Sequence, residues 1–177
     1  ETIIKDYGAD AVRLFILSDS PPEKDVQWSE EGIKSSYKFI NKLWDLNLKI
    51  IQQINQNHET DTDEDFIKFT NKFIKKVTDN LNNFSYNIII ANLHEMHSYL
   101  IKTINKKYKK KTLIENYKKI LNVINPIIPH FSLECLKKID EKAKLAWPNY
   151  DEKLIVENIV PFVVQINGKK RDVLEIE

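Results

Sequence analysis

A row of lysines lies within residues 25–54, in the stretch DVQWSEEGIKSSYKFINKLWDLNLKIIQQI. Lys34, Lys38 and Lys42 recur every four residues, with Ser35 and Asn41 beside them. Residues four apart lie on one face of a helix, so the three ammonium groups would form a ridge about three turns long. Such a ridge suits a phosphate backbone. The pattern alone is equally compatible with a plain solvated face, because exposed helices often carry a lysine in every turn.

A second group of chemically capable side chains is the sequence HEMH, formed by His94, Glu95 and His97. It is similar to the helix that holds zinc in zinc proteases. Those helices place two histidines four residues apart on one face, whereas here the spacing is three. Histidines on the helix surface, or half-buried there, are therefore expected in place of a metal site.

A third candidate is the basic run NKKYKKK at residues 105–111, which includes one aromatic residue. Cations interleaved with an aromatic ring can hold nucleic acid. The run falls at a corner between two expected helices, where lysines usually serve solvation. Solvation is the favoured interpretation.

Catalytic chemistry is not indicated elsewhere. Glycines occur at positions 8, 32 and 168 only, so no glycine-rich phosphate loop is possible. Adjacent carboxylates at 30–31 and 63–65 lie at an expected helix start and in a loop, where capping and solubility explain them. No catalytic residue, metal site or cofactor is expected in these 177 residues.

Length and composition fit a helical core with a small additional unit. The chain has 177 residues, and 27 basic against 26 acidic residues give a formal charge of +1, which favours no particular partner. Its apolar runs fall far short of the ~20 residues of a membrane span. The single cysteine, Cys135, predicts no internal disulfide and a cytoplasmic location; a buried thiol is favoured over a reactive one. Because the chain begins at Glu1 and stops within an expected strand, we expect it to be part of a larger protein.

Hydrophobic spacing predicts helices first and strands last. Two short helices broken near Gly8 should occupy residues 2–18, with an apolar stripe at Val12, Phe15 and Ile16. Ser29 is the expected N-cap of a long helix. The apolar stripe of that helix is expected at Ile33, Tyr37, Ile40, Trp44, Leu48 and Ile51. A loop over 55–65, helices over 66–81, 85–105 and 113–125, and a short helix around 131–139 should follow.

The C-terminal pattern changes to that of strands. Two β-rich runs flank Asn167-Gly168, which is the strongest short signal for a two-residue hairpin loop. The fold class expected is mainly α: an antiparallel bundle of four main helices, with this hairpin at one end. Its core should contain Trp44, Phe73, Leu93 and Leu121, and Trp28 should be at least half buried.

Four segments together resemble a known family. YGADAVRLFILSDSPPEKDVQWSEEGIKSSYKFINKLW, ILNVINPIIPHFSLECL, AWPNYDEKLIVE and VVQINGKKR are similar, in this order, to segments of bacterial-type leucyl-tRNA synthetases that follow the KMSKS loop. The likeness runs nearly from end to end. Valine and isoleucine enzymes share the first helices in outline, but the Ser-Pro-Pro-Glu turn and the Gln-Ile-Asn-Gly-Lys hairpin are typical of the leucine enzymes among these relatives.

The resemblance implies a class I anticodon-binding-type helical bundle and the start of a C-terminal domain. Residues 1–25 would connect it to the catalytic domain, 26–150 would form the bundle, and 151–177 would form a linker and the first hairpin. The HIGH and KMSKS motifs are absent, so ATP- and magnesium-dependent leucylation would belong to the parent chain. The expected partners are leucine tRNA and the catalytic domain of the same monomeric chain, without a membrane.

Site residues follow from the same resemblance. Lys38 and Lys42 fall where the family carries two arginines on the side facing tRNA, with Lys34 and Asn41 in the same row. The change to lysine keeps the charge but loses bidentate geometry. Two residues of the hairpin, Lys169 and Arg171, match a basic pair of the family.

Two other functional classes stay open from the residues themselves. A helical protein-interaction module would share the bundle, but it would expose a large apolar patch and bind in a salt-insensitive way. A small helical enzyme would need a pocket with perturbed ionisable groups, for which the sequence offers no candidate.

Overall fold

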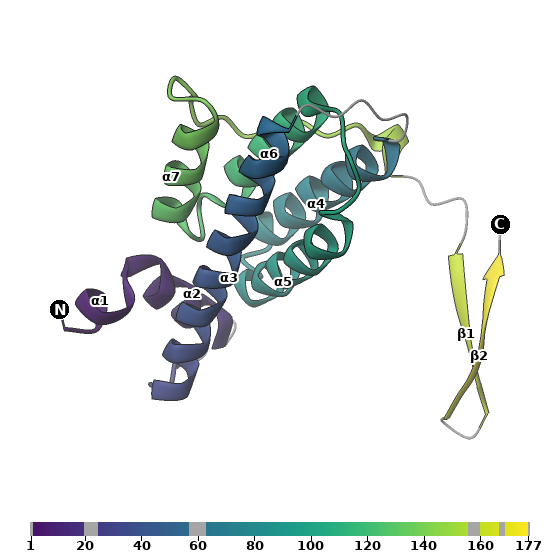
Figure 1. Ribbon diagram of the computed structural model, residues 1–177. Helices are drawn as coiled ribbons and strands as arrows, with labels where there is room; N and C mark the ends of the chain where they lie inside the picture. The colour runs from purple at the N-terminus through teal and green to yellow at the C-terminus, as the bar shows by residue number, and fades with distance from the viewer. Residues whose placement is uncertain (1, 20–24, 57–62, 156–159, 167–168, 177) are drawn as a thin grey trace.

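The computed structural model describes residues 2–19, 25–56, 63–155, 160–166 and 169–176 (Figure 1). It is mainly helical, as expected from the sequence. The elements in chain order are α1 (Thr2–Tyr7), α2 (Ala9–Asp19), α3 (Glu30–Asn55), α4 (Glu64–Asn82), α5 (Tyr86–Thr103), α6 (Lys110–Ile124), α7 (Pro129–Ile139), the short 3₁₀ helix η1 (Glu152–Leu154), β1 (Val160–Ile166) and β2 (Lys169–Ile176).

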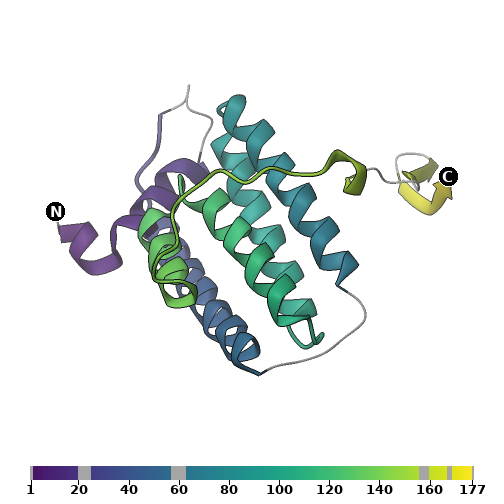
Figure 2. The same cartoon turned by 90° about the horizontal axis from the view of Figure 1, so that it is seen from above.

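The long helices α3, α4, α5 and α6 form the bundle. Figure 2 shows successive helices running in opposite directions across it. α4 packs against both α5 and α6, and α3 packs against α5, α6 and α7. α2 lies across one end, where it contacts α3, α5 and α7. No helix within the described residues is long and apolar enough to cross a membrane.

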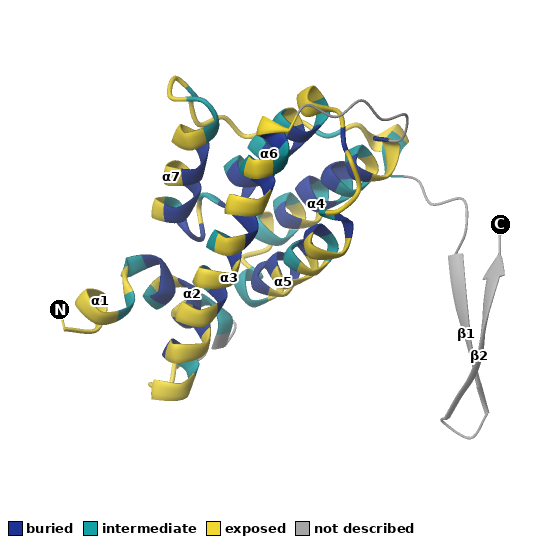
Figure 3. Ribbon diagram, in the orientation of Figure 1, coloured by how far each residue is buried: buried dark blue, intermediate teal, exposed yellow. Residues whose placement is uncertain are grey.

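The core lies where the facing stripes of these helices meet, and Figure 3 shows them as the buried inner faces. Phe73, Leu93 and Leu121 are buried there, which confirms three of the four expected core residues. The expectation for Trp44 is wrong, because its side chain is only partly buried and packs on the core from outside. Its indole is shared between the edge of Phe131, at 6.3 Å between ring centroids, and the ammonium group of Lys138, 4.1 Å from the ring.

The expected apolar stripes of the first helices are also partly wrong. On α3, Tyr37 and Leu48 are 40% and 48% exposed, and on α2 Ile16 is 47% exposed. The side chains of α3 that are buried are Ile33, Ser36, Phe39, Leu43, Leu46, Asn47, Ile50 and Ile54. This helix carries apolar residues in two phases of the 3.6-residue period, and the bundle buries the phase that contains Phe39 and Leu43.

Positive backbone angles end two helices. Gly8 has φ of +81° and its N–H donates to the carbonyl of Ile4, which stops α1 and lets α2 leave in a new direction. Phe84 has φ of +54° at the end of α4, where the N–H of Ser85 donates to the carbonyl of Asn80. The break expected near Gly8 is confirmed.

The helix α2 holds the corner between α6 and α7. Buried Asp10 accepts hydrogen bonds from the backbone N–H groups of His130 and Phe131 at 3.3 and 2.6 Å. Its Oδ1 also lies 2.9 Å from Nδ1 of His130. Arg13 donates to the carbonyls of Pro126 and Ile127. Asp10 thus caps a helix that begins 119 residues later, from Asp10 to Pro129, and the YGAD and PIIPH segments are structural partners.

Trp28 differs from the expectation. Its side chain is 52% exposed, so it is slightly less than half buried. The indole meets the ring of Phe15 edge-on, with centroids 5.4 Å apart. A single edge contact covers only part of so large a side chain. Residues 20–24, which contain the expected Ser-Pro-Pro-Glu turn, lie outside the described residues.

Residues 140–151 cross the bundle as a strap without helix or strand, and η1 follows it. Trp147 donates from its indole to the hydroxyl of Thr78, and the backbone N–H of Asp151 donates to the side chain of Asn71. β1 and β2 then pair antiparallel, from Val160 opposite Ile176 to Ile166 opposite Lys169. The expected loop Asn167-Gly168 lies outside the described residues.

Candidate nucleic-acid interface

The lysine row stands on α3, whose start is fixed by its cap. The Ser29 hydroxyl accepts from the N–H of Gly32 at 3.1 Å, so the expected N-cap is confirmed. Glu30 and Glu31 occupy the first turn, where the helix dipole favours negative charge. The row therefore begins one turn into a well-anchored helix.

All the expected members of the row are exposed. Lys34, Lys38, Asn41 and Lys42 lie on the face of α3 opposite its buried stripe. Lys34 is partly neutralised by Glu30, with 3.6 Å between ammonium and carboxylate. Within the described part of the chain, Lys38 and Lys42 form no ion pair. These two carry the uncompensated charge of the row.

The row is longer than the sequence pattern suggested. Lys49 follows Lys42 by seven residues, two helical turns, and is likewise exposed without an ion pair in the described structure. The spacing of seven was the signal that could have found it. Three uncompensated ammonium groups thus line this face, with Asp45 as the acidic residue between Lys42 and Lys49.

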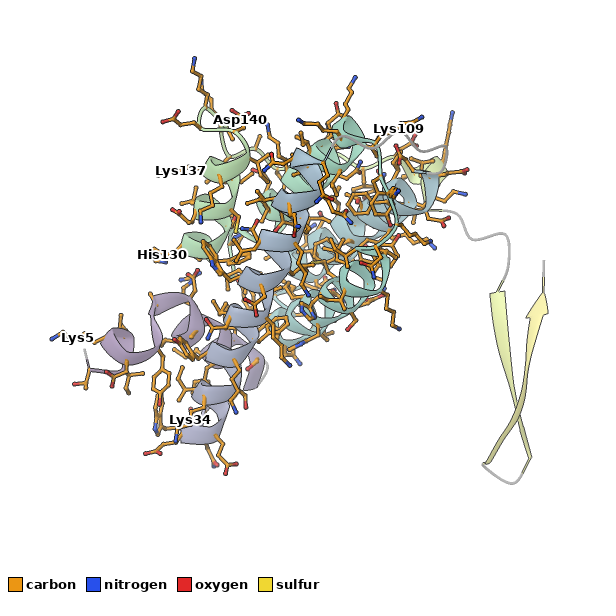
Figure 4. All side chains as sticks on the ribbon, viewed as in Figure 1. Lys5, Lys34, Lys109, His130, Lys137 and Asp140 are labelled. Atoms are coloured by element: carbon orange, nitrogen blue, oxygen red, sulfur yellow. The ribbon has the colours of Figure 1, made fainter. Side chains whose placement is uncertain are left out.

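The basic corner is built differently. Tyr108 is 4% exposed, and its ring packs on Phe66 with centroids 4.9 Å apart, so the aromatic of the run is a core residue. The ammonium group of Lys106 lies 3.6 Å from Asp65, and that of Lys111 lies 3.9 Å from Glu115. Figure 4 shows Lys34 and Lys109 at opposite ends of the bundle. The corner is therefore a separate, partly neutralised surface.

The side chains of HEMH point in different directions. The carboxylate of Glu95 accepts from Lys76 of α4, both oxygens at 2.9 Å. His94 lies on the ring of Phe39, with centroids 3.8 Å apart, and His97 meets the same ring edge-on at 5.8 Å. No three potential metal ligands gather among the residues that the structure describes.

Cys135 is packed inside α7. It is fully buried, and burial raises the pKa of its thiol to about 12. The thiolate needed for nucleophilic chemistry is thus strongly disfavoured, which agrees with the buried reading of this residue.

The expected basic pair of the C-terminal segment lies on β2. Lys169 stands opposite Ile166. Arg171 falls between residues 170 and 172, which pair with 165 and 164, so it occupies the irregular position of the ladder. The side chains of both lie outside what the structure describes, so neither can be placed beside α3.

Known proteins resemble this chain over its whole length. Leucine–tRNA ligase of Wolbachia pipientis subsp. Culex pipiens is 35% identical over 182 residues, and that of Rickettsia bellii is 39% identical over 183 residues. Each match covers 99% of this chain. The chain spans 22% and 21% of the lengths of these two relatives, about a fifth.

A solved structure shares the fold. It is a ternary complex of LeuRS, tRNA and LeuAMS from Agrobacterium radiobacter K84, which is 21% identical. Its TM-score is 0.81, and the alignment covers 99% of this chain and 24% of that one.

A family described as the anticodon-binding domain of tRNA ligase matches residues 63–177, which include α4 to α7 and the strap. This is well over half of the chain; it begins after α3, the helix that carries the lysine row. The chain therefore belongs to the anticodon-binding domain family of tRNA ligases.

Proposed function

We propose that this chain is the tRNA-docking part of a leucine–tRNA ligase, in which α3 holds the sugar-phosphate backbone of leucine tRNA. The observation that carries the proposal is the pair Lys38 and Lys42, which are exposed on one helix face and lack an ion pair among the described residues. Lysines placed in this way bind phosphates without reading sequence. Lys34 and Asn41 would add weaker contacts at the edges of the row.

The comparisons support the choice of RNA as partner. The relatives are named leucine–tRNA ligases, and the structure with the same fold contains tRNA. They do not favour a general protein-interaction module. Electrostatic docking also explains why lysine can stand where the family carries arginine, because a phosphate contact of this kind depends on charge more than on planar geometry.

The division of labour in the parent chain is part of the same proposal. Residues 1–25 would join the catalytic domain, 26–150 would dock tRNA, and 151–177 would lead into a C-terminal domain through its first hairpin. A two-stranded hairpin is marginal alone in water, so we expect β1 and β2 to pair with further structure of that domain, where Lys169 and Arg171 would contact RNA. ATP and magnesium would bind in the catalytic domain of a monomeric, cytoplasmic enzyme.

The test is to separate binding from activation in the full-length enzyme. Replacing Lys38 and Lys42 by glutamate adds repulsion where two phosphates would lie, so tRNA affinity measured by filter binding should fall clearly. Leucine-dependent pyrophosphate exchange should stay unchanged, because it needs no tRNA contact by α3.

A matched control uses the basic corner. Lys107 and Lys110 are also exposed and free of ion pairs in the described structure, and they lie at the end of the bundle away from Lys34. Their replacement by glutamate makes the same change in net charge and should alter tRNA affinity much less. If both double variants lose the same tRNA affinity, the effect comes from net charge and not from the position of the lysines. If the α3 variant keeps its affinity, the lysine row is only a solvated face.

A further inference from the structure

A pair of histidines adjoins the lysine row from the neighbouring helix. His94 and His97 lie one turn apart on α5 and flank the ring of Phe39, which belongs to α3. Phe39 itself is buried, whereas His94 is exposed and His97 is partly exposed. The two imidazoles therefore form the solvent side of the seam between α3 and α5.

The charges around this seam are mostly positive. On α3 the ammonium group of Lys42 acts on both imidazoles, and that of Lys49 acts on His97. On α5 the neighbouring carboxylate of Glu95 is engaged by Lys76 of α4. The α2 helix also contacts α5, but Asp10 and Arg13 of α2 are engaged at the α6–α7 corner. Asp45 of α3 is an exposed carboxylate between Lys42 and Lys49, so an anion at this seam would meet several donors beside one acidic group.

The surroundings of the two histidines favour their neutral form in the free protein. Partial burial and the charge of Lys42 lower the pKa of His94 below its usual 6.5. Partial burial, then Lys42, His94 and Lys49, lower the pKa of His97 in the same direction. A phosphate placed between Lys42 and the rings would reverse the effect of that lysine, because a nearby negative charge favours the imidazolium form. The face of Phe39 would add a cation–π contact to protonated His94.

The seam continues into a groove that is open to solvent. A cavity of about 700 Å³ lies elsewhere, between α2 and α7, but one of about 530 Å³ separates the C-terminal halves of α3 and α5. Its polar lining comes from Lys49, Gln52, Gln53, Gln56 and Asn105. Amides can donate to phosphate oxygens and ribose hydroxyls, so the lining suits the same backbone that the lysines suit.

We propose that the RNA-binding face of α3 extends across this seam, so that His94 and His97 bind a backbone phosphate together with Lys42 and take up a proton from solvent as the RNA docks. The proposal rests on the proposed function, and it adds a second helix and a protonation step to it. Lys42 is the shared member, since its charge acts on both histidines.

The consequence is an affinity that depends on pH. Binding is strongest below the pKa values of the free histidines, where protonation costs nothing, and it weakens as pH rises through their higher pKa values in the complex. Each proton taken up changes the dissociation constant by up to about tenfold per pH unit inside that window. Lysine ammonium groups and backbone phosphates keep their charges throughout, so they contribute no such slope.

The test uses the 177-residue chain and a leucine tRNA transcript. Dissociation constants are measured from about pH 5.5 to about 7.5 at fixed salt, and the imidazole protons are titrated by NMR with and without RNA. We expect the affinity to fall by about tenfold or more across this range. The resonances of His94 and His97 should titrate at higher pH in the complex.

Two variants make the assignment specific. His94→Gln with His97→Gln keeps hydrogen-bonding groups but cannot take up a proton, so binding should persist with a flattened pH profile. His130→Gln removes an exposed histidine of α7, which lies beside Asp10 and away from the seam, and should keep the profile of the original chain. Circular dichroism checks that each variant is folded.

The outcomes distinguish this inference from the proposed function. Salt-sensitive tRNA binding with a flat pH profile would contradict the role of the histidines and leave that of the lysine row intact. An unchanged pH profile in the double histidine variant would do the same. A complete absence of tRNA binding would overturn both. A pH profile that disappears only in the double histidine variant supports the seam.

Discussion

Replacing Asp10 by alanine should destabilise the bundle through an element that lies far away in sequence. Asp10 is 6% exposed and caps the first turn of α7, with the N–H of Phe131 at 2.6 Å and that of His130 at 3.3 Å. Loss of an N-cap costs about 1 kcal/mol, and hydrogen bonds to a charged group contribute about 1.5–3 kcal/mol each. These terms overlap, so we expect a loss of about 2–3 kcal/mol in the free energy of unfolding.

The assay is urea or thermal unfolding followed by circular dichroism at 222 nm. For a chain of this size each kcal/mol corresponds to about 2–4 °C, so Tm should fall by about 5–10 °C. Asp6→Ala is the matched control: it removes an exposed carboxylate of α1, four residues earlier in the chain, and should change the stability by less than about 0.5 kcal/mol. If Asp10→Ala is as stable as the control, Asp10 does not hold the α6–α7 corner.

Three further outcomes can be checked by stability and reactivity. Gly32→Ala should destabilise by about 1 kcal/mol although alanine favours helices, because its Cβ would lie 2.4 Å from a ring carbon of Phe15; a gain in urea midpoint would contradict the close packing of α2 and α3. Phe84→Gly should stabilise by about 0.5–1 kcal/mol, since Phe84 is 63% exposed at positive φ, whereas Phe84→Ala keeps the strain and should bring no gain in Tm. Cys135, with its pKa raised to about 12 by burial, should react with iodoacetamide far more slowly in the folded chain than in urea; equal rates would refute its burial.

Local features of the sequence predicted the parts of the fold that depend on neighbouring residues. The Ser29 cap and the break near Gly8 each depend on hydrogen bonds or angles within one turn, and both are found. The pairing of Lys38 with Lys42 on one helix face is predictable for the same reason. A spacing of four residues fixes a shared face regardless of what the helix packs against.

Features that arise from packing between distant segments cannot be predicted from local sequence patterns. The helix α3 carries apolar residues on two faces, and periodicity cannot decide which face the bundle buries. The sequence therefore predicts Tyr37 in the apolar stripe, whereas the structure exposes it. The meeting of His94 with Phe39 joins residues 55 positions apart, 39 and 94, and leaves no local pattern. The hydrogen bonds between Asp10 and the start of α7 span even more of the chain and likewise leave no local pattern.

The measurement that tests the central claim most directly is the salt dependence of tRNA affinity for the 177-residue chain. Replacing Lys38 and Lys42 by glutamine removes two charges and adds none, so each lost phosphate contact should flatten the plot of log affinity against log salt by about 0.7–0.9. The stability of the double variant should change by less than about 0.5 kcal/mol per site at this exposed face. A wild-type slope and wild-type affinity in the folded double variant would contradict the assignment of α3 as the surface that holds the RNA backbone.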